Sequence, residues 1–375
     1  MFHVKQETPA PLAFLDDDID RARRGDLLRD RPAPQPRGGL SFCSNDYLAL
    51  ASELAPSAPS GAGGSRLVSG DGPLHFQLEA ASAELVQQPA ALVFTSGYAT
   101  NVGTLSALAG PDDLIISDSL NHASLIDGAR LSRAAIQIVP HLDVSAVELA
   151  LRSRSRRRAF VVTESYFSMD ADTPDLPFLR RLCDEHQAVL VVDEAHALGV
   201  LGPEGRGLCA ATGIRADVLV GTFGKAFGAG GAFVAGCPSL ITWLWNRARS
   251  FVFSTGLSPA VAAAALQGLQ RAGSQPERRA RVHQAALQLR TGLARLGVTA
   301  AGEGHIVPWI LGPPALALGV ARRLRELGID VRAIRPPSVP EGTARLRLTV
   351  TSAHSPAAID GALASIGTAL SSSGG

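Results

Sequence analysis

Residues 189–196 read Val-Leu-Val-Val-Asp-Glu-Ala-His, and this stretch decides the fold class. An unbroken apolar run of this length predicts a strand covered on both faces, which is typical of a parallel sheet in an α/β protein. Further apolar runs predict neighbouring strands at 91–94, 114–116, 136–139, 160–162, 218–220 and 232–234. Several are separated by helical stretches, such as 177–186. The sequence therefore predicts an α/β fold with a mainly parallel, seven-stranded sheet flanked by helices.

The remaining segments predict an arm and a second, smaller α/β unit. Residues 14–31 predict a charged amphipathic helix, which the prolines that follow it would end. After about residue 258, long Ala/Leu/Arg-rich helices alternate with strand-like runs near 306–310 and 345–350. We expect four parts: an N-terminal helical arm (1–45), a large domain with the site (46–258), a small C-terminal domain (259–370) and a flexible tail (371–375).

Composition excludes several classes of function. The chain of 375 residues carries 35 basic and 34 acidic side chains, so there is no overall electrostatic case for nucleic-acid binding. No apolar stretch approaches the roughly 20 residues of a membrane helix, and the N-terminus lacks the apolar core of a secretory signal. The four cysteines are scattered without metal-ligand spacing, which favours reduced, mostly buried thiols and no metal site. These observations predict a cytoplasmic enzyme without a membrane or nucleic-acid partner.

The largest cluster of like charge is the arginine cluster at 152–158, which lies just before a predicted strand. A solvated helix end is the favoured interpretation, because no aromatic residues interleave the arginines for base stacking. A nucleic-acid patch and a docking site for an acidic carrier protein are the alternatives.

Chemistry is expected where the strands end, because open α/β sheets bind ligands beyond the carboxyl ends of their strands. The segments at those positions are Thr95–Tyr98, Glu164–Asp170, Asp193–His196 and Gly221–Lys225. They combine hydroxyl and glycine turns with an acid, a histidine and a lysine.

Lys225 and Asp193 carry the most specific signal. A lysine in the mouth of a sheet has a desolvated amine suited to Schiff-base chemistry, although a lone lysine more often extends to solvent. An acid at the end of an apolar strand needs a partner, and a pyridinium nitrogen or a helix N-terminus would each serve. A phosphate-binding loop is excluded because Lys225 is followed by Ala226, and a dinucleotide fingerprint is weak because Gly228–Gly231 leads into a strand.

Two further elements complete the pattern. Ser96–Tyr98 opens a helix whose free N–H groups could hold a phosphate, although alone it is only a capped helix start. His122 has a flat ring suited to stacking on a planar cofactor, although a lone histidine is more often structural. Phosphate cradle, stacking ring, acid and lysine on one sheet together predict a site for pyridoxal 5'-phosphate.

Five motifs resemble those of the α-oxoamine synthases: Asn45–Leu48, Phe167–Asp170, Asp193–His196, Thr222–Lys225 and Ser254–Thr255. These are fold-type I pyridoxal-phosphate enzymes that join an amino acid to an acyl thioester with loss of carbon dioxide. The resemblance spans about residues 14–365. Residues 333–349 are most similar to the branch that condenses L-alanine with pimeloyl-CoA or a pimeloyl-carrier protein in biotin biosynthesis. The glycine and acetyl-CoA branch is the alternative, and a non-catalytic partner subunit or a nicotinamide-dependent oxidoreductase is a more distant one.

The resemblance also implies roles for individual residues. It implies four catalytic residues, which also contact the cofactor: Lys225, His122, Asp193 and His196. Further cofactor contacts are implied for Ser96, Gly97, Tyr98, Ser168 and Thr222. Ser254 and Thr255 would reach the cofactor phosphate of a neighbouring subunit, which implies a homodimer. His122 would also face the substrates, together with Arg29, Asn45, Arg335, Ser338 and Arg347.

Overall fold

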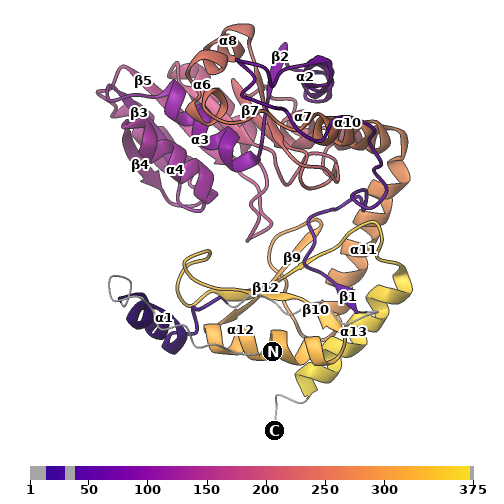
Figure 1. Cartoon of the computed structure of the whole chain (residues 1–375). Coiled ribbons are helices and arrows are strands. Elements are labelled where there is room, and N and C mark those ends of the chain that lie inside the picture. The colour runs from indigo at the N-terminus through magenta and orange to yellow at the C-terminus, as the bar shows by residue number, and fades with distance from the viewer. Residues whose placement is uncertain (1–13, 30–38, 372–375) are drawn as a thin grey trace.

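The computed structural model describes residues 14–29 and 39–371, which form two lobes (Figure 1). The larger lobe is built on a seven-stranded sheet with the order β2-β8-β7-β6-β5-β3-β4. Only β8 is antiparallel to its neighbours. The strands are β2 (Ala90–Phe94), β3 (Asp113–Asp118), β4 (Ala135–Val139), β5 (Arg158–Glu164), β6 (Val189–Asp193), β7 (Val218–Thr222) and β8 (Ala232–Gly236). The predicted fold class is confirmed.

Alternate residues of the central strands enter two different hydrophobic clusters, as a sheet covered on both faces requires. On β6, Val191 belongs to one cluster and Leu190 and Val192 belong to the other. The Val191 cluster includes residues of α3 (Gly97–Leu108), α4 (Ala123–Ser132), α8 (Pro238–Arg247) and α9 (Arg249–Val252). The other cluster includes residues of α2 (Pro73–Leu85), α5 (Val144–Arg152), α6 (Leu176–Glu185), α7 (Gly207–Thr212) and α10 (Pro259–Ser274).

Strand β4 departs from the prediction. Its run of residues forms a strand, but the expectation that both faces are covered is wrong, because Ile138 is 68% exposed and Ile136 38% exposed. The physical reason is its place at the edge of the sheet, where it pairs only with β3. An apolar run alone does not distinguish an edge strand from a central one.

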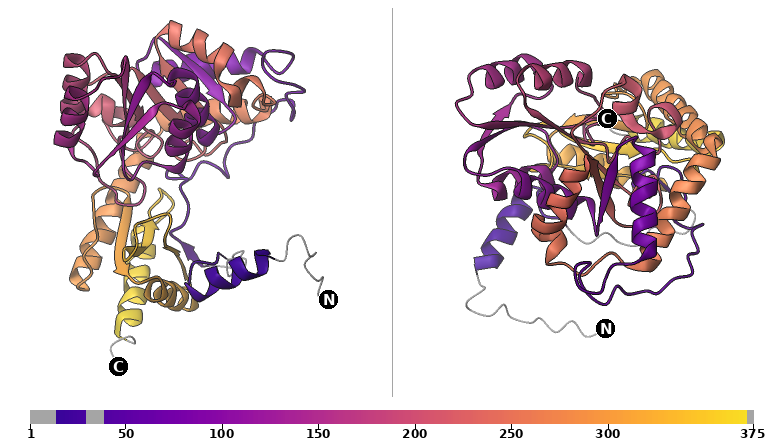
Figure 2. Two further views of the ribbon diagram at one scale, coloured as in Figure 1. Left: turned by 90° about the vertical axis from the view of Figure 1, so that its left-hand side faces the viewer. Right: turned by 90° about the horizontal axis from the view of Figure 1, so that it is seen from above.

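The smaller lobe contains a three-stranded antiparallel sheet with the order β11-β12-β9 (Figure 2, left). Its elements are α11 (Pro276–Arg295), β9 (Ile306–Gly312), α12 (Pro314–Glu326), β11 (Arg332–Ile334), β12 (Ala344–Thr349) and α13 (Pro356–Ser371). A short parallel pair, β1 (Leu40–Ser41) and β10 (Ile329–Asp330), attaches the early part of the chain to this lobe. One cluster of buried residues continues from this lobe to the large sheet, so the two lobes share a core.

Helix α1 is shorter than predicted, since it spans Phe14–Arg24 and not residues 14–31. Asp26 adopts a left-handed backbone conformation (φ 56°), which ends the helix before the prolines. The prolines expected to end the helix lie within residues 30–38, outside the described part of the chain, as do residues 1–13 of the predicted arm and 372–375 of the predicted tail. The four domain limits stay a prediction. Among the described helices, none is long and apolar enough to cross a membrane.

Two of the four cysteines are buried, Cys183 and Cys209. Cys43 is half-buried and Cys237 is exposed, so the expectation of mostly buried thiols holds for half of them. All four are free thiols.

Candidate active site

The carboxyl ends of β5, β6 and β7 bring the predicted acid and lysine to one edge of the sheet. The register pairs Glu164 with Asp193 and Asp193 with Val220. Strand β7 ends at Thr222, and the turn after it carries Lys225. Parallel strands therefore place these residues together, as predicted from the order of the apolar runs.

Lys225 is only partly exposed, and its charge interacts with both acids of this edge. Burial lowers the pKa of Lys225 to about 8, assisted by the nearby Arg347 and opposed by Asp193 and Glu164. A neutral amine is therefore accessible near neutral pH. This is the property that a nucleophile or proton acceptor requires.

Asp193 is 6% exposed and held in a fixed orientation. It accepts hydrogen bonds from Asn101 Nδ2 (2.7 Å) and from the backbone N of Ala195 (2.9 Å). A buried carboxylate with two donors is stabilised as a fixed negative charge, which suits the partner of a protonated ring nitrogen. Asn101, on α3, was not identified from the sequence. The available signal was its amide side chain on the helix that follows the predicted phosphate cradle.

His196 is buried, and its Nδ1 lies 2.6 Å from the hydroxyl of Tyr47. Burial holds the pKa of His196 well below its usual range, and the charges of Lys225 and Arg347 act in the same direction. The ring is therefore neutral. When Tyr47 donates to Nδ1, the proton of the ring resides on Nε2, which leaves an N–H donor for a ligand. Tyr47 lies in a motif noted in the sequence, but no role was predicted for it.

The start of α3 forms the predicted cradle. Ser96 is the N-cap, and its hydroxyl accepts from the backbone N of Ala99 (3.1 Å). A Cβ on Gly97 would lie 4.0 Å from the side chain of Thr222, so the helix start directly adjoins the end of β7. Tyr98 is 50% exposed, and its hydroxyl donates to Asp127 Oδ2 (2.6 Å). A helix N-terminus beside a hydroxyl is a suitable place for a phosphate.

His122 caps α4, and its backbone N donates to Glu164 Oε1 (2.7 Å). Its ring Nδ1 contacts the hydroxyl of Ser124 (2.7 Å). This contact leaves Nε2 and the face of the exposed ring open to a ligand.

Arg347, on β12, joins the two lobes at the site. Its Nε donates to the backbone O of Ser168 (2.6 Å), and its Nη1 donates to Asn45 Oδ1 (3.0 Å). Its Nη2 is buried and has no hydrogen-bond partner within the described residues. A buried, unpaired guanidinium nitrogen costs free energy unless a ligand accepts from it, and a carboxylate fits that geometry.

A cavity of about 390 Å³ lies between the lobes and unites predicted residues from both. His122, Glu164 and Ser168 line it from the large lobe, and Ser338 lines it from the small lobe. Arg29 donates to the Ser338 hydroxyl (3.1 Å), so the end of the arm reaches this region.

Arg335 donates to the backbone oxygens of Asp26 and Leu28. It therefore also holds the arm segment that carries Arg29.

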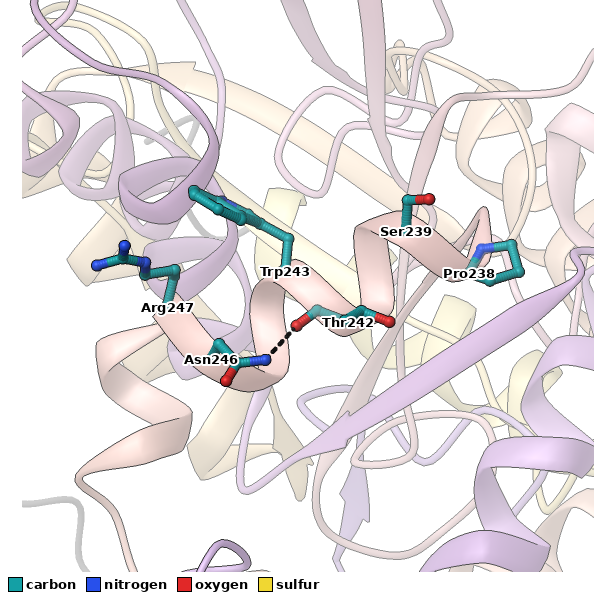
Figure 3. Close-up of a pocket in the computed structure, with 6 residues that line it drawn as sticks. All are labelled: Pro238, Ser239, Thr242, Trp243, Asn246 and Arg247. Carbon is teal, nitrogen blue, oxygen red and sulfur yellow. Dashed lines mark hydrogen bonds between the residues drawn. The ribbon is translucent and has the colours of Figure 1, made fainter.

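Ser254 and Thr255 lie apart from this cavity. Together with Thr95 they line a small hollow next to Arg66 and Phe251. Their predicted role toward a neighbouring subunit stays a prediction. Another hollow, of about 670 Å³, runs along α8 and contains none of the predicted site residues (Figure 3). It is lined by Pro238, Ser239, Thr242, Trp243, Asn246 and Arg247.

Comparison with known proteins places the chain in a family. The model of class I and II aminotransferases matches residues 37–366. The chain belongs to the class I and II aminotransferase family. Within it, the chain is 48% identical to 8-amino-7-oxononanoate synthase of Anaeromyxobacter dehalogenans strain 2CP-1, over 89% of this chain and 87% of the relative. It is 46% identical to the enzyme of the same name from Anaeromyxobacter sp. strain Fw109-5, over 98% of both chains.

Solved structures of related enzymes share the fold of this aminotransferase-family chain. Serine palmitoyltransferase of S. paucimobilis, solved with a bound PLP–myriocin aldimine, has a TM-score of 0.88 at 27% identity and covers 98% of this chain and 100% of that one. The 8-amino-7-oxononanoate synthase of Francisella tularensis has a TM-score of 0.75 at 26% identity, over 90% and 99% of the two chains. The resemblance inferred from the motifs is confirmed.

The residues present in this aminotransferase-family chain fit pyridoxal phosphate. Asp193 offers a fixed carboxylate, Lys225 an amine of lowered pKa, and the α3 N-terminus beside Thr222 a phosphate cradle. The unpaired nitrogen of Arg347 would accommodate the carboxylate of an amino acid.

Proposed function

We propose that the chain is a pyridoxal-phosphate-dependent acyltransferase that condenses L-alanine with a pimeloyl thioester. The products would be 8-amino-7-oxononanoate, carbon dioxide and the free thiol of the carrier, as biotin biosynthesis requires. The names of relatives 46–48% identical over most of both chains support this activity. The observation within the structure that carries it is the buried, unpaired Nη2 of Arg347, because an α-amino acid supplies the matching carboxylate.

Each residue of the site would have a separate role in the reaction. Arg347 would bind the carboxylate of alanine through Nη2, while its bonds to Ser168 and Asn45 keep the guanidinium in place. Lys225, whose pKa is lowered to about 8, would bond to the cofactor and then accept and return the α-proton. Asp193 would keep the ring nitrogen protonated, and His196 would donate from Nε2 to the ring oxygen. When bound, the cofactor supplies an electron-withdrawing ring that stabilises negative charge at the α-carbon.

The acyl donor would enter the cavity between His122 and Ser338, with Arg29 beside its outer end. For the arginine cluster at 152–158, a solvated helix end and a docking site for an acidic carrier protein both stay predictions. The cluster ends at Arg158, the first residue of β5, whose seven residues place Arg158 roughly 20 Å from Glu164 at the other end of the strand. Several of its arginines are also engaged, for example Arg158 with Asp113 (2.7 Å) and Arg152 with Glu148 (2.5 Å).

We also propose that the enzyme is a homodimer that works in the cytoplasm. The exposed aromatic side chain of Phe253, which directly precedes Ser254 and is 72% exposed, supports a partner surface there. The four free thiols are consistent with a reducing compartment.

The test is to record the absorbance spectrum of the purified protein and to titrate it with L-alanine and with glycine. We expect a visible band that shifts at a lower concentration of alanine than of glycine, and Lys225→Ala should abolish turnover. A protein that stays colourless with added pyridoxal phosphate would refute the cofactor assignment. A better response to glycine would retain the family and change the substrate to that of a glycine C-acetyltransferase.

A further inference from the structure

Two buried carboxyl groups lie side by side at the centre of the site. Glu164 ends β5 and Asp193 ends β6, and the parallel register pairs them directly. Both residues are almost fully buried, since Glu164 is 4% exposed and Asp193 is 6% exposed. Neighbouring strands are about 5 Å apart, so two negative charges here would repel each other strongly.

The hydrogen bonds decide which of the two acids keeps a proton. Asp193 accepts from Asn101 Nδ2 and from the backbone N of Ala195, and both donors favour its ionised form. Within the described residues, the side-chain carboxyl of Glu164 accepts a single hydrogen bond, from the backbone N of His122. One donor compensates a buried charge less than two, so the proton of the pair resides on Glu164.

We propose that Glu164 is a positioning residue that works in its neutral, protonated form. Its carbonyl oxygen holds the backbone of His122 at the start of α4. Its neutrality keeps a second negative charge away from the place where Arg347 would hold the substrate carboxylate. This second role rests on the proposed function, because an ionised Glu164 would repel the carboxylate that Arg347 would hold.

The other charges that face Glu164 oppose one another. The pKa of Glu164 is raised to about 8, mainly by burial. The negative charge of Asp193 and, more weakly, that of Asp118 raise it further. The charge of Lys225 and the backbone N–H of His122 act in the opposite direction. For a buried acid with a raised pKa, the unfolded chain loses the proton first, so the stability of the folded state falls progressively as the pH rises from about 4.5 to about 8, and no further above that.

Glu164→Gln tests the proposal, because glutamine keeps the carbonyl oxygen and is always neutral. The melting temperature of the full chain is measured from pH 5 to pH 9. We expect the wild type to lose roughly 2–4 °C relative to Glu164→Gln as the pH rises to 8, followed by a constant difference. A difference that is the same at every pH would overturn the proposal.

A second measurement covers the case in which the variant does not fold. The infrared carbonyl band of a protonated carboxylic acid should be present in the wild type at pH 7, fall to about half its intensity near pH 8 and vanish well above that pH. Glu194→Gln is the matched control, because Glu194 is also a buried glutamate with a raised pKa. The absence of such a band, or its loss in Glu194→Gln, would overturn the proposal.

Alanine binding separates this inference from the proposed function. We expect affinity for L-alanine to fall about 10-fold more between pH 7 and pH 9 in the wild type than in Glu164→Gln. If neither protein binds alanine at pH 7, the proposed function fails, while the melting and infrared results still decide the protonation of Glu164. If both bind alanine with the same pH dependence, the role of Glu164 toward the carboxylate is wrong.

Discussion

A histidine between two aspartates anchors the loop that carries Ser168. His141 Nδ1 lies 2.8 Å from Asp118 Oδ1, and its Nε2 lies 3.1 Å from Asp172 Oδ2. The imidazole also meets the ring of Phe167 edge-on at 4.5 Å. Burial alone would lower the pKa of His141, but the two carboxylates raise it to about 10. The folded protein therefore keeps this histidine charged throughout the neutral range.

The size of the effect follows from the raised pKa. At 1.36 kcal/mol per pH unit, a change from 6.5 to about 10 corresponds to at most about 5 kcal/mol. His141 is 20% exposed, and solvent and salt screen part of this attraction, so we expect about 2–3 kcal/mol. Because the folded pKa is raised, this stability is fully present below about pH 6.5 and is lost as the pH rises toward 10.

The assay is urea unfolding of the wild type and of His141→Gln at pH 6.5 and at pH 10. We expect His141→Gln to be less stable by about 2–3 kcal/mol at pH 6.5, and the gap to shrink by more than half at pH 10. His186→Gln is the control, because His186 is a partly buried histidine with no ion pair among the described residues. A gap of equal size at both pH values would show that the loss comes from packing and not from the charge of His141.

Three further substitutions test the site and its support. Arg347→Lys should raise the KM for alanine about 10- to 100-fold with a smaller change in kcat, because lysine cannot replace the forked donor; steady-state kinetics checks this, and an unchanged KM would exclude the carboxylate role. Asp170→Asn should lower the free energy of unfolding by about 2–3 kcal/mol, since Arg345 is buried and pairs with Asp170 at 2.6 Å. Urea unfolding measures this, and a variant as stable as the wild type would contradict it. Gly228→Ala should lower the melting temperature or prevent folding, because φ at Gly228 is +65° and the new Cβ would lie 2.6 Å from the backbone N of Ala51. Thermal unfolding followed by circular dichroism measures this, and a melting temperature equal to that of the wild type would refute it.

The sequence predicted those site residues that depend on strand order alone. Asp193 and Lys225 follow apolar runs, and parallel strands bring such positions to one edge whatever the details of packing. The contacts that fix their chemistry were not predictable in this way. Asn101 reaches Asp193 across 92 residues, and Tyr47 reaches His196 across 149. Such pairs depend on how a helix and a loop pack on the sheet, which local patterns do not specify.

The loop at 168–170 shows most clearly what local patterns do not reveal. From the sequence, this loop was expected only to follow a strand and to contact the cofactor through Ser168. The structure shows that two arginines of the other lobe hold it. Arg345 and Arg347 alternate with Leu346 and Leu348 on β12, so both guanidinium groups project from the same face of the strand. Arg345 binds Met169 O (2.8 Å) and Asp170, and Arg347 binds Ser168 O.

The two arginines differ in how many of their nitrogens are already hydrogen-bonded, and this difference leaves one of them able to bind a ligand. Arg345, 2% exposed, has contacts within the protein for all its donor nitrogens, including Thr343 through Nε (3.0 Å) and Nη2 (3.2 Å). It therefore fixes the loop without help from a substrate. Arg347 shares the same strand and the same loop, so its orientation is set before a ligand arrives. Of its three nitrogens, Nη2 has no hydrogen-bond partner in the part of the chain that the structure describes. A preorganised donor loses little conformational freedom on binding, which favours tight and specific recognition of a carboxylate.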